Sequence, residues 1–85
     1  MDFLLPEHET VIELKFVRDV GHGKRIGQEL LIDIAHYRQH PKCRRLWCAV
    51  FDPSHFVVNS DGLVKDLEGE HTQGEHTVNV KLLLL

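Results

Sequence analysis

A continuous apolar run in the middle of the chain, Leu46 to Phe51, limits the possible folds more than any other segment. Asp52 and Pro53 end the run, and a stretch with helical periodicity comes before it. Short apolar runs bounded by turn residues are typical of strands inside a sheet. Because a helix precedes this strand, we expect it to lie parallel to an earlier strand of the same sheet.

The earlier strand is predicted from Thr10 to about Arg18, where the side chains alternate between two faces. A shorter run, Phe3 to Leu5, stops at Pro6, and only residues 7–9 separate the two runs. So short a connection predicts an antiparallel hairpin. One face of the second strand holds Ile12, Leu14 and Phe16, and the other holds Val11, Glu13, Lys15 and Val17.

A helix is predicted from about Lys24 to His40, with Pro41 ending it. Apolar side chains recur there at helical spacing. The preceding segment, Gly21 to Arg25, is predicted to be a loop. Its glycines lie between a strand and a helix, as in phosphate-binding loops, but their spacing does not match the dinucleotide-binding motif, so a flexible loop is the preferred interpretation.

The second half of the chain predicts smaller elements. We expect a short edge strand at Phe56–Val58, a short helix from Gly62 to Leu67, a polar loop from Glu68 to Glu75, and a final strand over Val78–Leu84. The predicted class is therefore α/β, with a mixed sheet, an N-terminal β-hairpin, one long crossover helix and a parallel central strand.

The composition narrows the functional classes. The chain has 85 residues, which predicts one domain, and a formal net charge of −3, which argues against binding nucleic acid through bulk positive charge. The two cysteines, Cys43 and Cys48, come without a secretion signal or a membrane-spanning run, so we expect free thiols and a cytoplasmic protein.

Three charged side chains are predicted to converge on the first hairpin. Folding the chain back near His8 places Asp2 opposite residues 13–15, and Glu13 and Lys15 share one face of their strand. Charged residues inside an apolar strand are locally unfavourable, and such exceptions are expected mainly at functional sites. Two carboxylates can bind Mg²⁺ or Mn²⁺, and a lysine can orient or deprotonate a water molecule, so the cluster suits phosphodiester hydrolysis.

The order of these residues resembles the PD-(D/E)xK nuclease superfamily, which has the restriction-endonuclease-like fold. Asp2-Phe3-Leu4-Leu5 is followed, after a turn, by Val11-Ile12-Glu13-Leu14-Lys15. The resemblance spans nearly the whole chain and continues through Asp33-Ile34, Tyr37, His40-Pro41, residues 43–53, Asn59, Gly62-Leu63 and Lys65-Asp66-Leu67. It is similar to the C-terminal nuclease domain of some bacterial restriction and phage-defence proteins.

The resemblance implies a role for each residue of the cluster. Asp2 and Glu13 would bind the metal, the backbone carbonyl of Leu14 would add a ligand, and Lys15 would act on the water. DNA would be the substrate. Separately, a homodimer or a place in a larger chain is expected, because the short chain leaves sheet edges to cover and double-strand cleavage needs two sites. Residues weighed as nucleic-acid contacts are Lys24, Arg25, Gln28, Tyr37, Arg44 and Arg45, of which Gln28 and Tyr37 do not match the Gln-x-x-x-Tyr spacing of some branches.

The chain departs from this pattern at its beginning, where the usual N-terminal helix and strand are missing and Met1 precedes Asp2 in place of proline. A second interpretation is therefore an inactive nuclease-like domain that binds nucleic acid or dimerises. A third is an unrelated small α/β interaction domain. The histidine- and glutamate-rich segment 68–76 could bind a transition metal, although a solvated loop is the preferred interpretation there.

Overall fold

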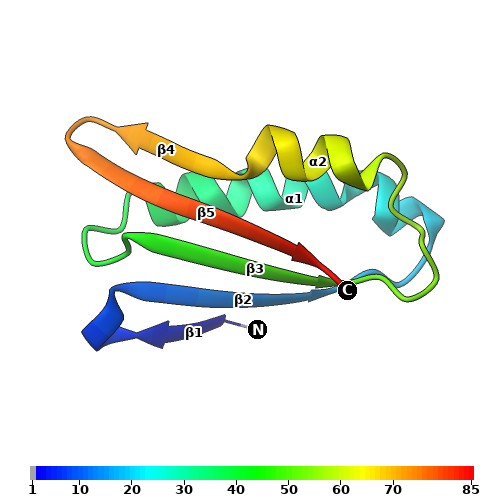
Figure 1. Ribbon diagram of the computed structural model, residues 1–85, viewed down its shortest axis with the longest axis horizontal. Coiled ribbons are helices and arrows are strands. Elements are labelled where there is room, and N and C mark those ends of the chain that lie inside the picture. Colours follow the sequence, from blue (N-terminus) through cyan, green and yellow to red (C-terminus); the bar gives the residue numbers. More distant parts are fainter. Residues whose placement is uncertain (1) are drawn as a thin grey trace.

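A computed structural model describes residues 2–85 of the chain, which form a five-stranded mixed sheet with two helices on one face (Figure 1). The strands lie in the order β1-β2-β3-β5-β4. β2, β3 and β5 are parallel to one another, while β1 and β4 pair antiparallel with β2 and β5 at the two edges. The elements are β1 (Asp2–Leu5), a 3-10 turn (Pro6–His8), β2 (Thr10–Phe16), α1 (Val20–Arg38), β3 (Arg45–Phe51), α2 (Ser60–Leu67), β4 (Gly69–Gln73) and β5 (His76–Leu84).

The predicted class is confirmed, and the arrangement is consistent with a restriction-endonuclease-like core. β1 and β2 form the expected antiparallel hairpin, in which Asp2 lies directly opposite Glu13. β3 lies parallel to β2 along its whole length, with Thr10 paired to Arg45 and Phe16 to Phe51. The apolar run that predicted a strand inside the sheet is therefore the central strand of five.

The predicted loop over residues 21–25 is wrong, because α1 already begins at Val20. Asp19 caps the helix: its carboxylate accepts a hydrogen bond of 2.7 Å from the backbone N–H of His22. The glycine at position 23 is required by close packing, not by a flexible loop. A Cβ atom at this position would lie 2.4 Å from the backbone oxygen of Phe56, so only glycine allows the helix to pack this closely.

The polar loop predicted over residues 68–75 is also wrong, because Gly69–Gln73 forms β4 and pairs antiparallel with β5. An edge strand bonds to one neighbour only, and most side chains of β4 are exposed, so it lacks the apolar alternation by which strands are recognised. Gly74, with a φ of 63°, provides the left-handed residue of the connecting turn.

Residues 56–58 do not form the predicted edge strand. Their backbone is held instead by the buried side chain of Asp52, whose two carboxylate oxygens accept hydrogen bonds of 2.9 Å from the N–H groups of Phe56 and Val57. Phe56 and Val57 pack against the core between β3 and α2 without joining the sheet.

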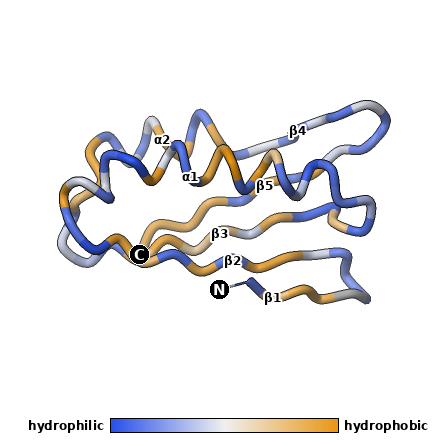
Figure 2. The backbone as a smooth tube through the Cα atoms, turned by 180° about the vertical axis from the view of Figure 1, so that it is seen from behind, coloured by the Kyte–Doolittle hydropathy of each residue, from blue (hydrophilic) through white to orange (hydrophobic). Residues whose placement is uncertain are grey.

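The two faces of the sheet differ in their covering. The core lies on the helical face, where strand side chains such as Leu46, Val50 and Val80 are fully buried against Ile26 and Leu30 of α1. Figure 2 shows that β1, β2 and β3 are built largely from hydrophobic residues. On the face opposite the helices, their exposed side chains include the aromatic rings of Phe16, Trp47 and Phe51. Glu13 and Lys15 lie on the helical face, because their partners across the β2–β3 ladder are the buried residues Cys48 and Val50.

Candidate active site

The structure brings together the three residues that the sequence predicted to converge. Asp2 and Glu13 are opposite one another on β1 and β2, and the Nζ atom of Lys15 lies 3.1 Å from Oε1 of Glu13. Glu13 is only 4% exposed, which is unusual for a carboxylate, whereas Asp2 lies at the exposed edge of the sheet. The cluster therefore has a buried acid, an exposed acid and a lysine on a single face.

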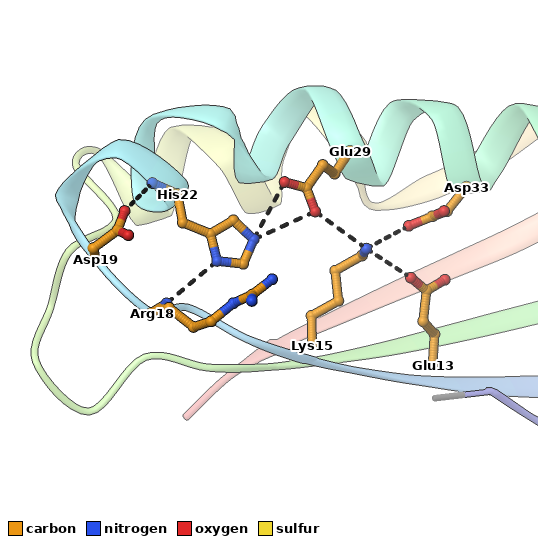
Figure 3. A network of polar contacts seen from close by, with 7 residues as sticks. All are labelled: Glu13, Lys15, Arg18, Asp19, His22, Glu29 and Asp33. Atoms are coloured by element: carbon orange, nitrogen blue, oxygen red, sulfur yellow. Dashed lines mark hydrogen bonds and ion pairs between the residues drawn. The ribbon is translucent and has the colours of Figure 1, made fainter.

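Helix α1 adds two further carboxylates to the lysine (Figure 3). Nζ of Lys15 lies 2.9 Å from Oδ2 of Asp33 and 3.6 Å from Oε1 of Glu29. Glu29 and Asp33 are four residues apart on α1, so both point to the same side of the helix, toward β2. The ammonium group thus has three carboxylate neighbours for its three N–H donors.

Tyr37 lies one helical turn beyond Asp33 and connects α1 to β1. Its hydroxyl donates a hydrogen bond to Oδ2 of Asp2. Burial, followed by the carboxylate of Asp2, raises the pKa of the Tyr37 hydroxyl above its usual range, so it remains a donor. This bond fixes the side chain of Asp2 on the helical face, on the same side as Glu13.

A buried histidine extends the cluster toward the start of α1 (Figure 3). Nδ1 of His22 accepts a hydrogen bond from the backbone N–H of Arg18 at 3.2 Å, so in the neutral ring the proton is on Nε2. That atom lies 3.2 Å from Oε2 of Glu29, and the same carboxylate reaches Lys15. A continuous polar chain therefore runs from Arg18 through His22 and Glu29 to Lys15.

The electrostatics of the cluster follow from its burial. Burial, and then the neighbouring carboxyl group of Asp33, raise the pKa of Glu13 to about 8, and the attraction of Lys15 offsets only part of this effect. Burial disfavours the charged form of Lys15, but Asp33 and Glu13 outweigh it, and the pKa of Lys15 is raised above its usual range. Lys15 is thus held as an ammonium ion inside an excess of acidic groups.

Two carboxylate oxygens of the cluster, Oε2 of Glu13 and Oδ2 of Asp33, are buried without a hydrogen-bond partner, and Oδ2 of Asp33 has the ammonium group of Lys15 at 2.9 Å. Asp2 lies opposite Glu13 on β1. Buried carboxylate oxygens normally have a partner, so the orphaned oxygen of Glu13 fits a hard divalent cation. Over residues 2–85, however, no three histidine, cysteine, aspartate or glutamate side chains are already arranged around a common ion position. The positive charge already present beside these carboxylates is the ammonium group of Lys15, which pairs with Glu13 and Asp33.

The residues predicted to contact nucleic acid are spread over both ends of the sheet. Lys24, Arg25 and Gln28 are exposed in the first half of α1, beside the ends of β2 and β3. At the other end, Arg44 pairs with Glu9 at 2.6 Å, and the guanidinium of Arg45 donates to the carbonyl of His8 at 2.9 Å. Leu14, the predicted backbone ligand, lies between Glu13 and Lys15 on β2.

Sequence reasoning missed three members of the cluster, His22, Glu29 and Asp33. Asp33 entered only as part of the family resemblance, and the other two were given no role. The signal was their helical spacing, because positions 22, 29 and 33 lie along one side of α1, next to the apolar stripe of Ile26 and Leu30. Polar residues flanking such a stripe lie close to the strands that the helix covers.

Two further predictions concern the rest of the chain. Cys43 and Cys48 are free and buried, as expected from their apolar surroundings. Within the part of the chain that the structure describes, no helix is long and apolar enough to cross a membrane.

Comparison with known proteins gives one match. The sequence profile of the DpnII-MboI restriction endonucleases, described as REase_DpnII-MboI, matches residues 1–83. Searches of curated proteins and of solved structures give no significant match. Because the profile covers almost the whole chain, this protein belongs to the DpnII-MboI restriction endonuclease family.

Proposed function

We propose that the chain is a metal-dependent nuclease of the PD-(D/E)xK type, which hydrolyses phosphodiester bonds of DNA through Asp2, Glu13 and Lys15. Membership of a restriction endonuclease family supports nuclease activity in general and DNA as the substrate. The metal requirement and the roles of the three residues are our proposal. Its setting would be restriction or phage defence in the bacterial cytoplasm.

Asp2 and Glu13 would hold the cation, with the backbone carbonyl of Leu14 as a third ligand. Mg²⁺ or Mn²⁺ suits these oxygen donors, and Mg²⁺ commonly binds through one or two carboxylates while keeping several waters. When bound, the ion would polarise the phosphoryl group and increase the acidity of a bound water. It would also favour the ionised form of Glu13, against the burial and the carboxyl group of Asp33 that raise the pKa of Glu13.

Lys15 would act as a hydrogen-bond donor. Hydrolysis adds a water oxygen to phosphorus and releases one bridging oxygen, which takes up a proton as it leaves as an alcohol. With its carboxylate neighbours on β2 and α1, the Lys15 ammonium is a fixed charge beside the proposed metal ligands. It would offset the charge of the phosphate, and it would orient the attacking water by giving up its longest contact, the 3.6 Å pair with Glu29. The pKa of Lys15 is raised in the structure, which contains no cation, and this favours the role of a donor over that of a base.

One observation carries the proposal above the others: the carboxylate of Glu13 is buried, retains an orphaned oxygen, and lies between Asp2 across the hairpin and Lys15 on its own strand. A purely structural ion pair does not require burying an acid with an unsatisfied oxygen, because this arrangement costs stability. Such a cost is expected where the group has a function.

A cleavage assay tests the proposal. Plasmid DNA is incubated with the protein in Mg²⁺ or Mn²⁺, and with EDTA in place of the metal. We expect cleavage only with metal, and a loss of at least about 100-fold in Glu13→Gln and Lys15→Ala, since each removes a group that acts in the transition state. Glu70→Gln and Lys65→Ala are matched controls, because both residues are exposed and lie away from the cluster on β4 and α2.

Metal binding is measured separately from activity. Mn²⁺ should raise the thermal unfolding temperature of the wild-type protein, and less so that of Asp2→Asn or Glu13→Gln. Cleavage that persists in Glu13→Gln, or in EDTA, would contradict the proposed mechanism. DNA binding without cleavage in either metal would instead assign the chain to the inactive, nucleic-acid-binding class.

A further inference from the structure

A second positive side chain, Arg18, lies beside the acidic cluster and takes no part in the mechanism described above. It follows the end of β2 by two residues and is exposed. Figure 3 shows its side chain passing below the imidazole ring of His22 toward Lys15. Within residues 2–85 its guanidinium group makes no hydrogen bond or ion pair, whereas the ammonium group of Lys15 has three carboxylate neighbours. Arg18 therefore has donors that no group of the described chain uses.

Arg18 and Lys15 line one open groove, which has a volume of about 390 Å³. Two positive side chains, one acid, one imidazole and two apolar side chains form its lining: Lys15, Arg18, Glu29, His22, Leu14 and Phe16. The side chain of Lys15, which is 18% exposed, borders this groove. A ligand in the groove would therefore lie against the lysine of the proposed active site and against Arg18.

A buried histidine holds the backbone of Arg18 in place. Nδ1 of His22 accepts the 3.2 Å hydrogen bond from the backbone N–H of Arg18, and His22 is only 7% exposed. Nε2 of the same ring lies 3.2 Å from Oε2 of Glu29, and that acid also contacts Lys15 at 3.6 Å. The two positive residues are therefore joined through His22 and Glu29 of α1. A fixed backbone lowers the entropy cost of placing the guanidinium group on a ligand.

The charges along the groove suit an anion. Among the described residues that line it, Glu29 is the one acid, and this acid already contacts Lys15. Glu13 and Asp33 also pair with Lys15, but neither lines the groove. Arg18 is thus the positive group whose charge no acid of the described chain offsets. A phosphodiester carries one negative charge and presents two non-bridging oxygens, which match the planar fork of a guanidinium group.

We propose that Arg18 binds the phosphate group next to the one that is cleaved, so that the groove is a subsite for the DNA backbone. This role of Arg18 rests on the proposed function, which places the reacting phosphate beside Lys15 and the metal ligands. Residues 15 and 18 are three positions apart, which corresponds to at most about 10 Å of extended backbone. The Arg18 side chain is turned toward Lys15, as a contact with the neighbouring phosphate requires.

Such a contact positions the DNA and carries no sequence information. Arg18 would hold the DNA strand in register, while Lys15 and the cation act at the cleaved bond. The contact is present both before the reaction and in the transition state, so its loss should raise KM and leave kcat nearly unchanged. Loss of Lys15 should instead lower kcat, which separates the two positive side chains by experiment.

Fluorescence anisotropy of a labelled DNA duplex measures this contact without cleavage when Ca²⁺, which also prefers oxygen ligands, replaces Mg²⁺. Binding of the full chain is recorded from about 50 to 200 mM KCl. Arg18→Gln should lower the affinity by about 10-fold, as expected for one charge-assisted hydrogen bond. It should also reduce the slope of log K against log[salt] by about 0.9, the value for one phosphate contact. Two duplexes of unrelated sequence should show the same loss.

Two further variants separate a phosphate contact from a change in overall charge. Arg18→Lys should keep the wild-type salt slope, because it keeps the charge beside the phosphate. Lys65→Gln makes the same change in net charge at an exposed position of α2 and should bind like the wild type. In cleavage assays with Mn²⁺, Arg18→Gln should raise KM by about 10-fold and change kcat by less than about 2-fold.

The possible outcomes distinguish the role of Arg18 from the nuclease proposal. A wild-type salt slope in Arg18→Gln, or a loss of affinity for only one of the two duplexes, would overturn the role of Arg18 and leave the nuclease proposal standing. An equal loss in Lys65→Gln would do the same, because overall charge would then explain the effect. If the wild type binds neither duplex, the proposed function fails, and the phosphate subsite fails with it.

Discussion

Asp33 of helix α1 and Lys15 of strand β2 form an ion pair of 2.9 Å, the shortest contact that the lysine makes with a carboxylate among the described residues. The pair joins the helix to the strand that carries the proposed metal ligand. Asp33 also contributes to the raised pKa of Glu13, so one side chain influences both the lysine and the acid of the proposed site.

Asp33→Asn is expected to lower the rate of metal-dependent cleavage by about 10- to 100-fold, which is typical of groups that orient a metal site from outside it. The amide keeps the shape of the side chain but loses the charge that positions Lys15. The rate is measured on plasmid DNA under single-turnover conditions. Asp66→Asn, at an exposed position of α2, provides the comparison, and equal rates for the two variants would show that Asp33 has no such role.

His22→Ala is expected to destabilise the fold by about 1–3 kcal/mol, because it leaves the N–H of Arg18 without its acceptor and removes one of the two groups that contact the carboxylate of Glu29. His22 is only 7% exposed, so water cannot fully replace these contacts. Urea denaturation gives the free energy of unfolding. His8→Ala, which removes an exposed imidazole, should change it by less than about 0.5 kcal/mol. A similar loss in both variants would count against the buried polar chain.

Two glycines of α1 offer a comparison within one helix. Gly23→Ala places a Cβ atom 2.4 Å from a backbone oxygen of Phe56, so the helix must move, and we expect a loss of about 1–3 kcal/mol. In Gly27→Ala the nearest atom is Cδ1 of Leu63 at 3.0 Å, the end of a flexible side chain. The gain in helix propensity, about 1 kcal/mol, should largely offset that contact. Thermal unfolding of both variants tests this ranking, and the reverse order would refute it.

The thiol of Cys48 should make the fold sensitive to alkali. Burial, and then the nearby acids Glu13 and Asp33, raise its pKa to about 12. The unfolded thiol ionises at lower pH than the folded one, so the contribution of Cys48 to stability is complete below the unfolded pKa and is lost as the pH rises toward 12. Between these values the free energy of unfolding should fall by up to about 1.4 kcal/mol per pH unit more in the wild type than in Cys48→Ala. Parallel pH profiles would contradict this expectation.

The sequence predicted the parts of the fold that have a clear apolar pattern and a short connection to the next element. The alternation of β2, the apolar run of β3 and the short hairpin connection were sufficient to place Asp2 opposite Glu13. The start of α1 was missed because Gly21 and Gly23 suggest a loop, while the reason for Gly23 is a contact with Phe56, more than 30 residues away. The capping side chain of Asp19 was the available signal.

The sequence predicted the site residues that lie on β1 and β2, but it missed those that lie on α1. A two-residue spacing on a strand fixes the relation of Glu13 to Lys15 without knowledge of the rest of the fold. The positions of Glu29 and Asp33 depend on which way α1 turns over β2, and periodicity alone does not determine that angle. β4 was missed for a related reason, since its pairing with β5 depends on backbone bonds rather than on an apolar pattern.

The alternation of β2 also has a consequence for how this protein can change over time. Ile12, Leu14 and Phe16 lie on the face of the sheet opposite the helices, while Glu13 and Lys15 belong to the acidic cluster, and the strand backbone separates the two sets. Mutations that alter the outer face of the sheet and mutations that alter the acidic cluster therefore fall on different residues. Selection can change the residues of either face while leaving those of the other face intact.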